Sequence, residues 1–149
     1  MGRVLTGEGR PTSEIRMHLL AYELRPDVSA VVHAHLPYAT ACTLAGIDLL
    51  EPILPEVVIT LGGIPTAAYA TPGTEEVPEA IRGIIQEYDA LLLSRHGAMT
   101  VGRDVMDAYN KIEKAGTHRP GRPGGPPSGT ADAIAPGGSG ETAAIGGKV

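Results

Sequence analysis

Apolar residues at helical spacing, with suitable residues at the ends, predict four helices in this chain. They are expected over residues 12–24, 37–44, 74–87 and 105–114. A hydroxyl of Thr12 or Ser13 could cap the first helix, and Glu14 suits the positive end of its dipole. Pro37 is typical of a first helical position, and Asp104 is typical of an N-cap.

Continuous apolar runs predict buried strands between these helices. The clearest are a run of about seven residues from Val28 and the run Ala90-Leu91-Leu92-Leu93. Shorter strands are expected over 98–101 and, between prolines and a glycine pair, around 57–60 and 66–69. Histidines stand at the ends of both strong strands, and the candidate chemistry lies there.

The first strand ends in Val31-Val32-His33-Ala34-His35. Side chains two residues apart point to the same face of a strand, so His33 and His35 lie side by side. Two adjacent imidazoles form a candidate metal clamp. By itself the pair leaves open an ordinary alternative, two partly exposed histidines with hydrogen-bond partners.

A third histidine, His96, follows the second strong strand and precedes a glycine. Strand ends of this kind often carry functional side chains in α/β domains. Three neutral imidazoles with one open position describe a catalytic zinc site. The alternative is a turn histidine bonded to the backbone, and Arg95 before it could be a surface charge or a substrate contact.

Three residues and a fourth histidine at the start of the first predicted helix are further candidates. Glu14 could act as an acid or base, or could simply complement the helix dipole. His18 lies on the same helix face, where a histidine packed behind the site is favoured over a fourth ligand. The hydroxyls of Thr12 and Ser13 suit a phosphate or carboxylate, or ordinary capping.

Composition and charge exclude several classes of protein. The 149 residues carry a net charge of −5, which argues against binding to the phosphate backbone of nucleic acids. No apolar run approaches the ~20 residues of a membrane span, and no secretory signal is recognisable. The single Cys42 cannot form an internal disulfide, and no Walker-type or Rossmann-type glycine pattern is present. We therefore expect a cytoplasmic protein that binds neither nucleic acid nor membrane.

The composition changes after Lys114. Residues 115–149 contain ten glycines and five prolines, and their only aliphatic residues besides alanine are Ile134, Ile145 and Val149. Such a segment buries too little apolar surface to offset its ordering entropy. We predict one folded domain over residues 1–114 and a disordered tail over 115–149.

Five short motifs together resemble the class II aldolase/adducin family, which includes fuculose-phosphate aldolase and ribulose-phosphate 4-epimerase. The motifs follow the order and the spacing that the family shows. They are Thr12-Ser13-Glu14, Arg25-Pro26-Asp27, Val31-Val32-His33-Ala34-His35, Pro37-Tyr38-Ala39-Thr40 and Arg95-His96-Gly97-Ala98. The resemblance implies an α/β fold, a three-layer α/β/α domain around a largely antiparallel central sheet that is incomplete in this chain. It also implies a zinc ion or another divalent metal, and usually a homotetramer.

The resemblance further implies a role for each candidate residue. These roles are metal binding for His33, His35 and His96, proton transfer for Glu14, and phosphate binding for Thr12 and Ser13. The implied activity is that of a zinc-dependent lyase, which cleaves or forms a C–C bond in a small sugar phosphate or related hydroxy-carbonyl compound. The reaction proceeds through an enediolate that zinc stabilises. The alternatives are a pentulose-phosphate 4-epimerase, an adducin-like interaction module without catalytic activity, or an inactive metal-binding fragment.

Two departures from the family bear on these alternatives. Family members carry an N-terminal Gly-Asn-x-Ser-like loop that grips the phosphate, and the present sequence starts after that point. The last family helix also continues further than Lys114, whereas here the sequence becomes rich in glycine and proline. We therefore expect a gene fragment whose 3′ end is read in another frame.

Overall fold

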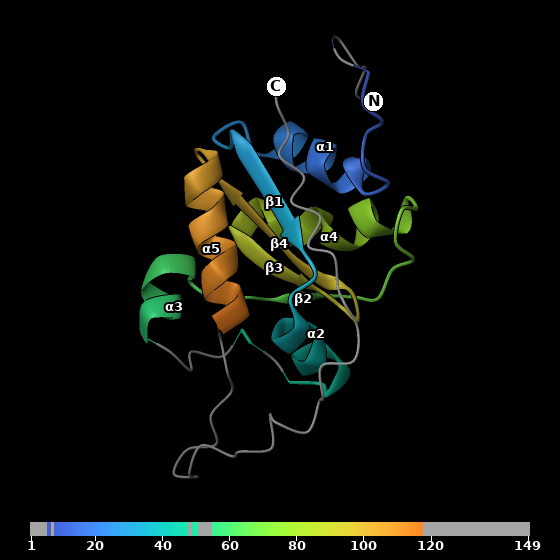
Figure 1. Ribbon diagram of the computed structural model, residues 1–149. Coiled ribbons are helices and arrows are strands. Elements are labelled where there is room, and N and C mark those ends of the chain that lie inside the picture. Colours follow the sequence, from blue (N-terminus) through green and yellow to red (C-terminus); the bar gives the residue numbers. More distant parts are fainter. Residues whose placement is uncertain (1–5, 7, 48, 51–54, 118–149) are drawn as a thin grey trace, which may run out of the picture.

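The described part of the chain forms five helices around a four-stranded sheet (Figure 1). The computed structural model describes residues 6, 8–47, 49–50 and 55–117. The helices are α1 (Ile15–Leu24), α2 (Pro37–Leu44), α3 (Pro55–Leu61), α4 (Glu76–Glu87) and α5 (Val105–Thr117). The strands are β1 (Ala30–Ala34), β2 (Thr66–Ala67), β3 (Ala90–Leu93) and β4 (Gly97–Gly102). None of the helices in these residues is long and apolar enough to cross a membrane.

The sheet is mixed but mostly antiparallel. Its order is β1-β4-β3-β2, in which β4 pairs antiparallel with β1 and β3, and β2 pairs parallel with β3. Ala34 lies opposite Ala98, and Leu93 lies opposite Gly97. The end of β1 therefore lies beside the turn that joins β3 to β4. This confirms the α/β fold with a largely antiparallel sheet.

Helices cover both faces of the sheet, as the alternation of side chains along β3 shows. Leu91 and Leu93 point into a core shared with α1 and α4. Ala90 and Leu92 point to the opposite face, into a second core shared with α2, α3 and α5. Figure 1 shows α4 and α5 on opposite sides of the sheet. The architecture is therefore three layers, α/β/α.

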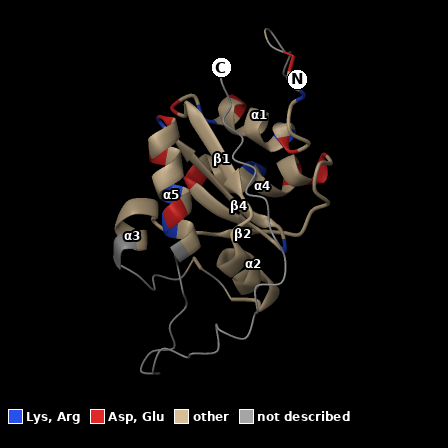
Figure 2. Cartoon of the chain, viewed as in Figure 1, with Lys and Arg blue, Asp and Glu red and all other residues tan. Residues whose placement is uncertain are grey.

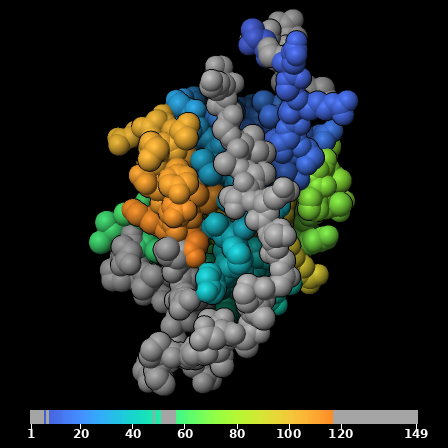
Figure 3. All heavy atoms as spheres, viewed as in Figure 1, coloured from blue at the N-terminus to red at the C-terminus, as the bar shows by residue number. Residues whose placement is uncertain are grey.

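Helices α2 and α5 differ in their charge. Helix α2 has no charged residue, whereas α5 carries both signs (Figure 2). The two helices lie side by side on the face seen in Figure 3. Ala39 and Cys42 of α2 are buried in the second core, so α2 is held firmly against the sheet.

An ionic network joins the two helical layers where β3 begins. The Asp89 carboxylate accepts hydrogen bonds from Arg25 at 2.8 Å and from Lys111 at 2.9 Å. Arg25 follows α1, and Lys111 belongs to α5, so the carboxylate connects both faces of the sheet. Burial alone would raise the pKa of Asp89, but the hydrogen bonds from these two cations outweigh burial and lower it.

Most of the expected elements are present, with changed ends. The helix over 37–44 and the strand over 90–93 match the observed bounds. The strand expected from Val28 begins at Ala30, and the last helix continues to Thr117. Residues 118–149 of the predicted tail lie outside the described residues.

The first helix begins later than expected, and its predicted cap is wrong. Helix α1 starts at Ile15 with Glu14 at the N-cap position, and no side chain caps it. The Thr12 hydroxyl instead accepts the N–H of Glu14 at 3.2 Å. The turn over residues 12–14 thus orients Glu14 at the helix end.

The strand predicted around residues 57–60 is wrong, because these residues belong to α3. Val57 and Leu61 are buried, whereas Val58 and Ile59 between them are exposed. Burial at positions i and i+4 is the pattern of a helix that packs one face. The β-branched residues of this run favour a strand only locally, and packing against the second core overrides that preference.

Candidate metal centre

His33 occupies the penultimate position of β1 and is partly buried. Its Nδ1 lies 2.9 Å from the carbonyl oxygen of Ala98 on the neighbouring strand. Because a carbonyl only accepts, Nδ1 carries the proton and Nε2 has a free lone pair. Nε2 is buried and has no hydrogen-bond partner in the described structure.

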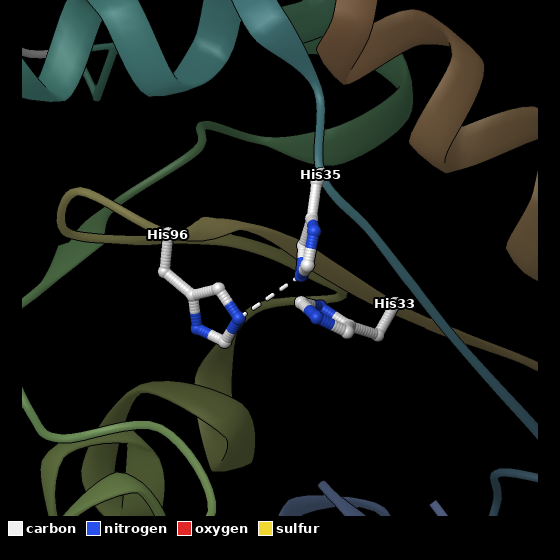
Figure 4. Close-up of side chains that lie close together, drawn as sticks. All are labelled: His33, His35 and His96. Carbon is white, nitrogen blue, oxygen red and sulfur yellow. Dashed lines mark hydrogen bonds between the residues drawn. The ribbon is translucent and has the colours of Figure 1, made fainter. Parts of the chain in front are cut away.

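His35 and His96 complete a cluster around this lone pair (Figure 4). Their Nε2 atoms lie 3.1 Å apart, although the residues are separated by 61 positions in the chain. One nitrogen from each of the three rings lies within 4.8 Å of the other two. The structure thus brings together the three histidines that the sequence singled out, His33, His35 and His96.

Gly97 allows the end of β1 to lie close to the turn that carries His96. A Cβ at residue 97 would lie 2.5 Å from the carbonyl oxygen of Ala34 and 3.2 Å from the Cα of His35. Side chains do not tolerate such short distances, so the end of β1 can pass the turn only beside a glycine. The sequence marks this glycine only as a neighbour of His96.

The chemistry of the cluster fits a divalent metal ion. Burial lowers the pKa of His33 to about 4, and burial also lowers the pKa of His96. Both rings are therefore neutral near pH 7, which is the form that binds metals. Three imidazoles form a donor set that suits zinc and similar cations. The buried, unpartnered Nε2 of His33 would gain a partner if an ion were bound.

The carboxylate of Glu14 lies near this cluster without belonging to it. The group of possible metal ligands found among the described residues comprises the three histidines alone. Burial is the main cause that lowers the pKa of His96, and the negative charge of Glu14 opposes that effect. Oε2 of Glu14 is buried and lacks a hydrogen-bond partner within the described ranges. The arrangement offers an acceptor oxygen beside a metal-binding cluster.

The remaining candidates at this helix end occupy different surroundings. Burial lowers the pKa of His18, with the Glu14 charge opposing it, and His18 is not in the metal-ligand group. This agrees with a histidine packed behind the site. Thr12 and Ser13 are exposed at the start of the turn, where Ser13 lies near Gly73.

Two features of the site were not predicted from the sequence. One is the Ala98 carbonyl, which selects the tautomer of His33, and the other is the pair of α2 hydroxyl groups that hold the turn carrying His96. A backbone carbonyl leaves no signal in a sequence. For α2, Thr40 and Thr43 stand three residues apart and so share one helix face, a spacing that could have indicated a contact.

A protein-family model described as the Class II Aldolase and Adducin N-terminal domain matches residues 1–116 of this chain. An L-fuculose phosphate aldolase from Methanococcus maripaludis is 37% identical over 107 residues, which are 71% of this chain and 57% of that protein. A 3-oxo-tetronate 4-phosphate decarboxylase from Escherichia coli K12 is 32% identical over 117 residues, or 76% of this chain and 55% of that protein.

Solved structures show the same relationship. A sugar-phosphate aldolase from Thermotoga maritima superposes with a TM-score of 0.66 at 31% identity and covers 75% of this chain and 53% of the other. The chain therefore spans little more than half the length of the relatives that it matches.

Proposed function

Since this chain belongs to the class II aldolase and adducin N-terminal domain family, we propose that it carries the metal centre of a zinc-dependent lyase. The reaction would cleave or form a C–C bond in a small sugar phosphate or a related hydroxy-carbonyl compound. The observation that supports this most directly is the convergence of His33, His35 and His96, with the Nε2 of His33 buried and unpartnered.

Each residue near the centre has a defined task in this proposal. The three histidines would hold the cation, which when bound supplies a Lewis acid that polarises a substrate carbonyl. The hydrogen bond from His33 to Ala98 fixes the ring orientation before any ligand arrives. Glu14 would move the substrate proton, because its Oε2 is shielded from water and is not engaged by another described group.

Three further assignments stay predictions. The exposed hydroxyls of Thr12 and Ser13 would bind the substrate phosphate from the turn before α1. A homo-oligomer is expected from the resemblance, and a cytoplasmic location from the composition. Native mass spectrometry and cell fractionation would measure these two properties.

The metal site is tested by metal analysis of purified protein. We expect about one zinc per chain in the wild type, and loss of zinc in His33→Ala. His18→Ala is the matched control, because His18 is a partly buried histidine close to His33 that lies outside the ligand group. A folded wild type without zinc, or with zinc retained in His33→Ala, would contradict the proposal.

The proposed chemistry is tested with a panel of sugar phosphates in an aldol-cleavage assay. Glu14→Gln should keep its zinc and lose at least about 100-fold in kcat, since proton transfer by a side chain contributes this much or more. Zinc-loaded wild type that is inactive on the whole panel would favour an adducin-like interaction module. Interconversion of pentulose phosphates without cleavage would indicate the epimerase.

Decarboxylation of a phosphorylated 3-oxo acid is the second candidate function. It is favoured by the 32% identity to the 3-oxo-tetronate 4-phosphate decarboxylase, which is close to the 37% identity to the fuculose phosphate aldolase. Both reactions cleave a C–C bond at the carbon next to a carbonyl group, and a cation that polarises this carbonyl would stabilise the electron pair left on that carbon. Measuring released CO2 as well as released aldehyde with each substrate would distinguish the two.

A further inference from the structure

The turn that carries His96 has an unfavourable backbone. Residues 94–96 join β3 to β4, and the N–H of His96 donates to the carbonyl of Leu93 at 3.0 Å. The middle residue, Arg95, has a φ of +61° and is the one non-glycine residue with a positive φ in the described part of the chain. L-amino acids with a long side chain rarely adopt this left-handed conformation, so something outside the turn must stabilise it.

Helix α2 provides that support through Thr43. The Thr43 hydroxyl accepts the N–H of Arg95 at 2.9 Å and donates its own proton to the carbonyl of Thr40 at 2.8 Å. Because the proton is used within the helix, the oxygen is oriented as an acceptor toward the turn. Thr43 is partly buried, which limits competition from water.

Thr40 adds a second, longer contact to the same turn. Its hydroxyl donates to the carbonyl of His96 at 3.4 Å. Helix α2 begins two residues after His35, so one rigid element follows one histidine of the cluster and binds the backbone of another. Ala39 and Cys42 fix this helix in the core beneath.

We propose that Thr43 is a positioning residue of the metal centre, whose hydroxyl holds Arg95 in the left-handed conformation and so directs His96 toward His35. This inference rests on the proposed function, since it presumes that the three histidines bind a metal ion. A loss of the hydroxyl would let the turn relax and would move the His96 ring away from the other two.

The test compares the affinity for Zn²⁺ of four full-length proteins by competition with a chromophoric chelator. Thr43→Val has nearly the same shape without the hydroxyl, and we expect its Kd to rise about 10- to 100-fold, as for other groups that orient metal ligands. Thr43→Ser retains the hydroxyl and should bind within about 3-fold of the wild type. The matched control is Thr66→Val, because the buried Thr66 hydroxyl has no partner among the described residues and its loss should leave the Kd unchanged.

A double variant keeps the inference testable if Thr43→Val disturbs folding. Glycine adopts a positive φ at no steric cost, so in an Arg95→Gly background the hydroxyl is no longer needed to hold the turn. Adding Thr43→Val to Arg95→Gly should therefore change the Kd by less than about 3-fold. Circular dichroism of the metal-free proteins would show whether each variant is folded.

The outcomes separate the two proposals. If the wild type binds no zinc, the proposed function fails, and the role of Thr43 fails with it. If the wild type binds zinc and Thr43→Val binds it equally well, or if the 10- to 100-fold loss persists in the Arg95→Gly background, the metal centre stands and the role of Thr43 is overturned.

Discussion

Burial of the His33 ring makes the metal-free protein sensitive to acid. The pKa of His33 is lowered from 6.5 to about 4, mainly by burial. Between these values the unfolded chain binds a proton that the folded chain excludes, so stability rises with pH. The contribution is complete above about pH 6.5 and is lost as the pH falls toward 4.

We expect acidification from about pH 7.5 to about pH 5 to cost the metal-free wild type about 2 kcal/mol of unfolding free energy through this residue. Removing the titrating ring in His33→Gln should reduce the pH dependence by that amount. Urea unfolding of chelator-treated protein at both pH values measures it. Equal losses in the two proteins would show that another group is responsible.

At the level of residues, the sequence predicted the members of the site better than their environment. His33 and His35 could be paired from the alternation of a strand alone. Their proximity to His96, which follows His35 by 61 positions, depends on the antiparallel register of β1 and β4, which a single sequence does not contain. The family resemblance supplied that link. It could not supply the hydrogen bonds to Ala98 and Arg95, which involve backbone atoms.

Gly97 couples two structural elements, and replacing it tests how closely β1 and the following turn must approach. Ala at this position would place Cβ 2.5 Å from the Ala34 carbonyl oxygen, which is backbone and cannot rotate away. We expect Gly97→Ala to lower the unfolding free energy by about 1–3 kcal/mol and to weaken zinc binding at least about 10-fold. Urea unfolding and chelator competition measure these two effects.

Gly83→Ala is the matched control for this substitution. Gly83 lies within α4, where a Cβ would meet nothing within 4 Å. Alanine stabilises such a helical position by about 0.5–1 kcal/mol, and zinc affinity should be unchanged. If Gly97→Ala binds zinc as tightly as Gly83→Ala, then β1 and the turn that carries His96 can move apart without a loss of zinc affinity.

The elements that could be predicted correctly are those in which local preference and packing agree. In α2, a proline occupies the first position and Gly46 with a φ of +68° follows the end, so both boundaries are marked in the sequence. In residues 57–60 the β-branched side chains favour a strand, while the burial of Val57 and Leu61 requires a helix. That conflict becomes visible only when the second core is known.

At the scale of the whole molecule, the described residues form two cores, one on each side of the sheet. The ionic network at Asp89 and the histidine cluster lie at opposite ends of β3. The chain nevertheless spans little more than half the length of its relatives, and the outer edge of β1 has no partner strand among the described residues.

The division into a domain and a tail can be tested on the whole chain by deletion. The composition of residues 118–149 offers only Ile134, Ile145 and Val149 as aliphatic residues other than alanine, which is little apolar surface for a core. We expect a chain ending at Thr117, after α5, to unfold within about 0.5 kcal/mol of the full chain and to bind zinc with the same Kd. Urea unfolding and chelator competition on both proteins measure this.

A chain ending at Ile112 is the control, because it removes the buried Ala115 and the last turn of α5 and should lower the stability clearly. If the chain ending at Thr117 is as unstable as the control, the segment after α5 belongs to the folded domain, and the assignment of a separate tail is wrong.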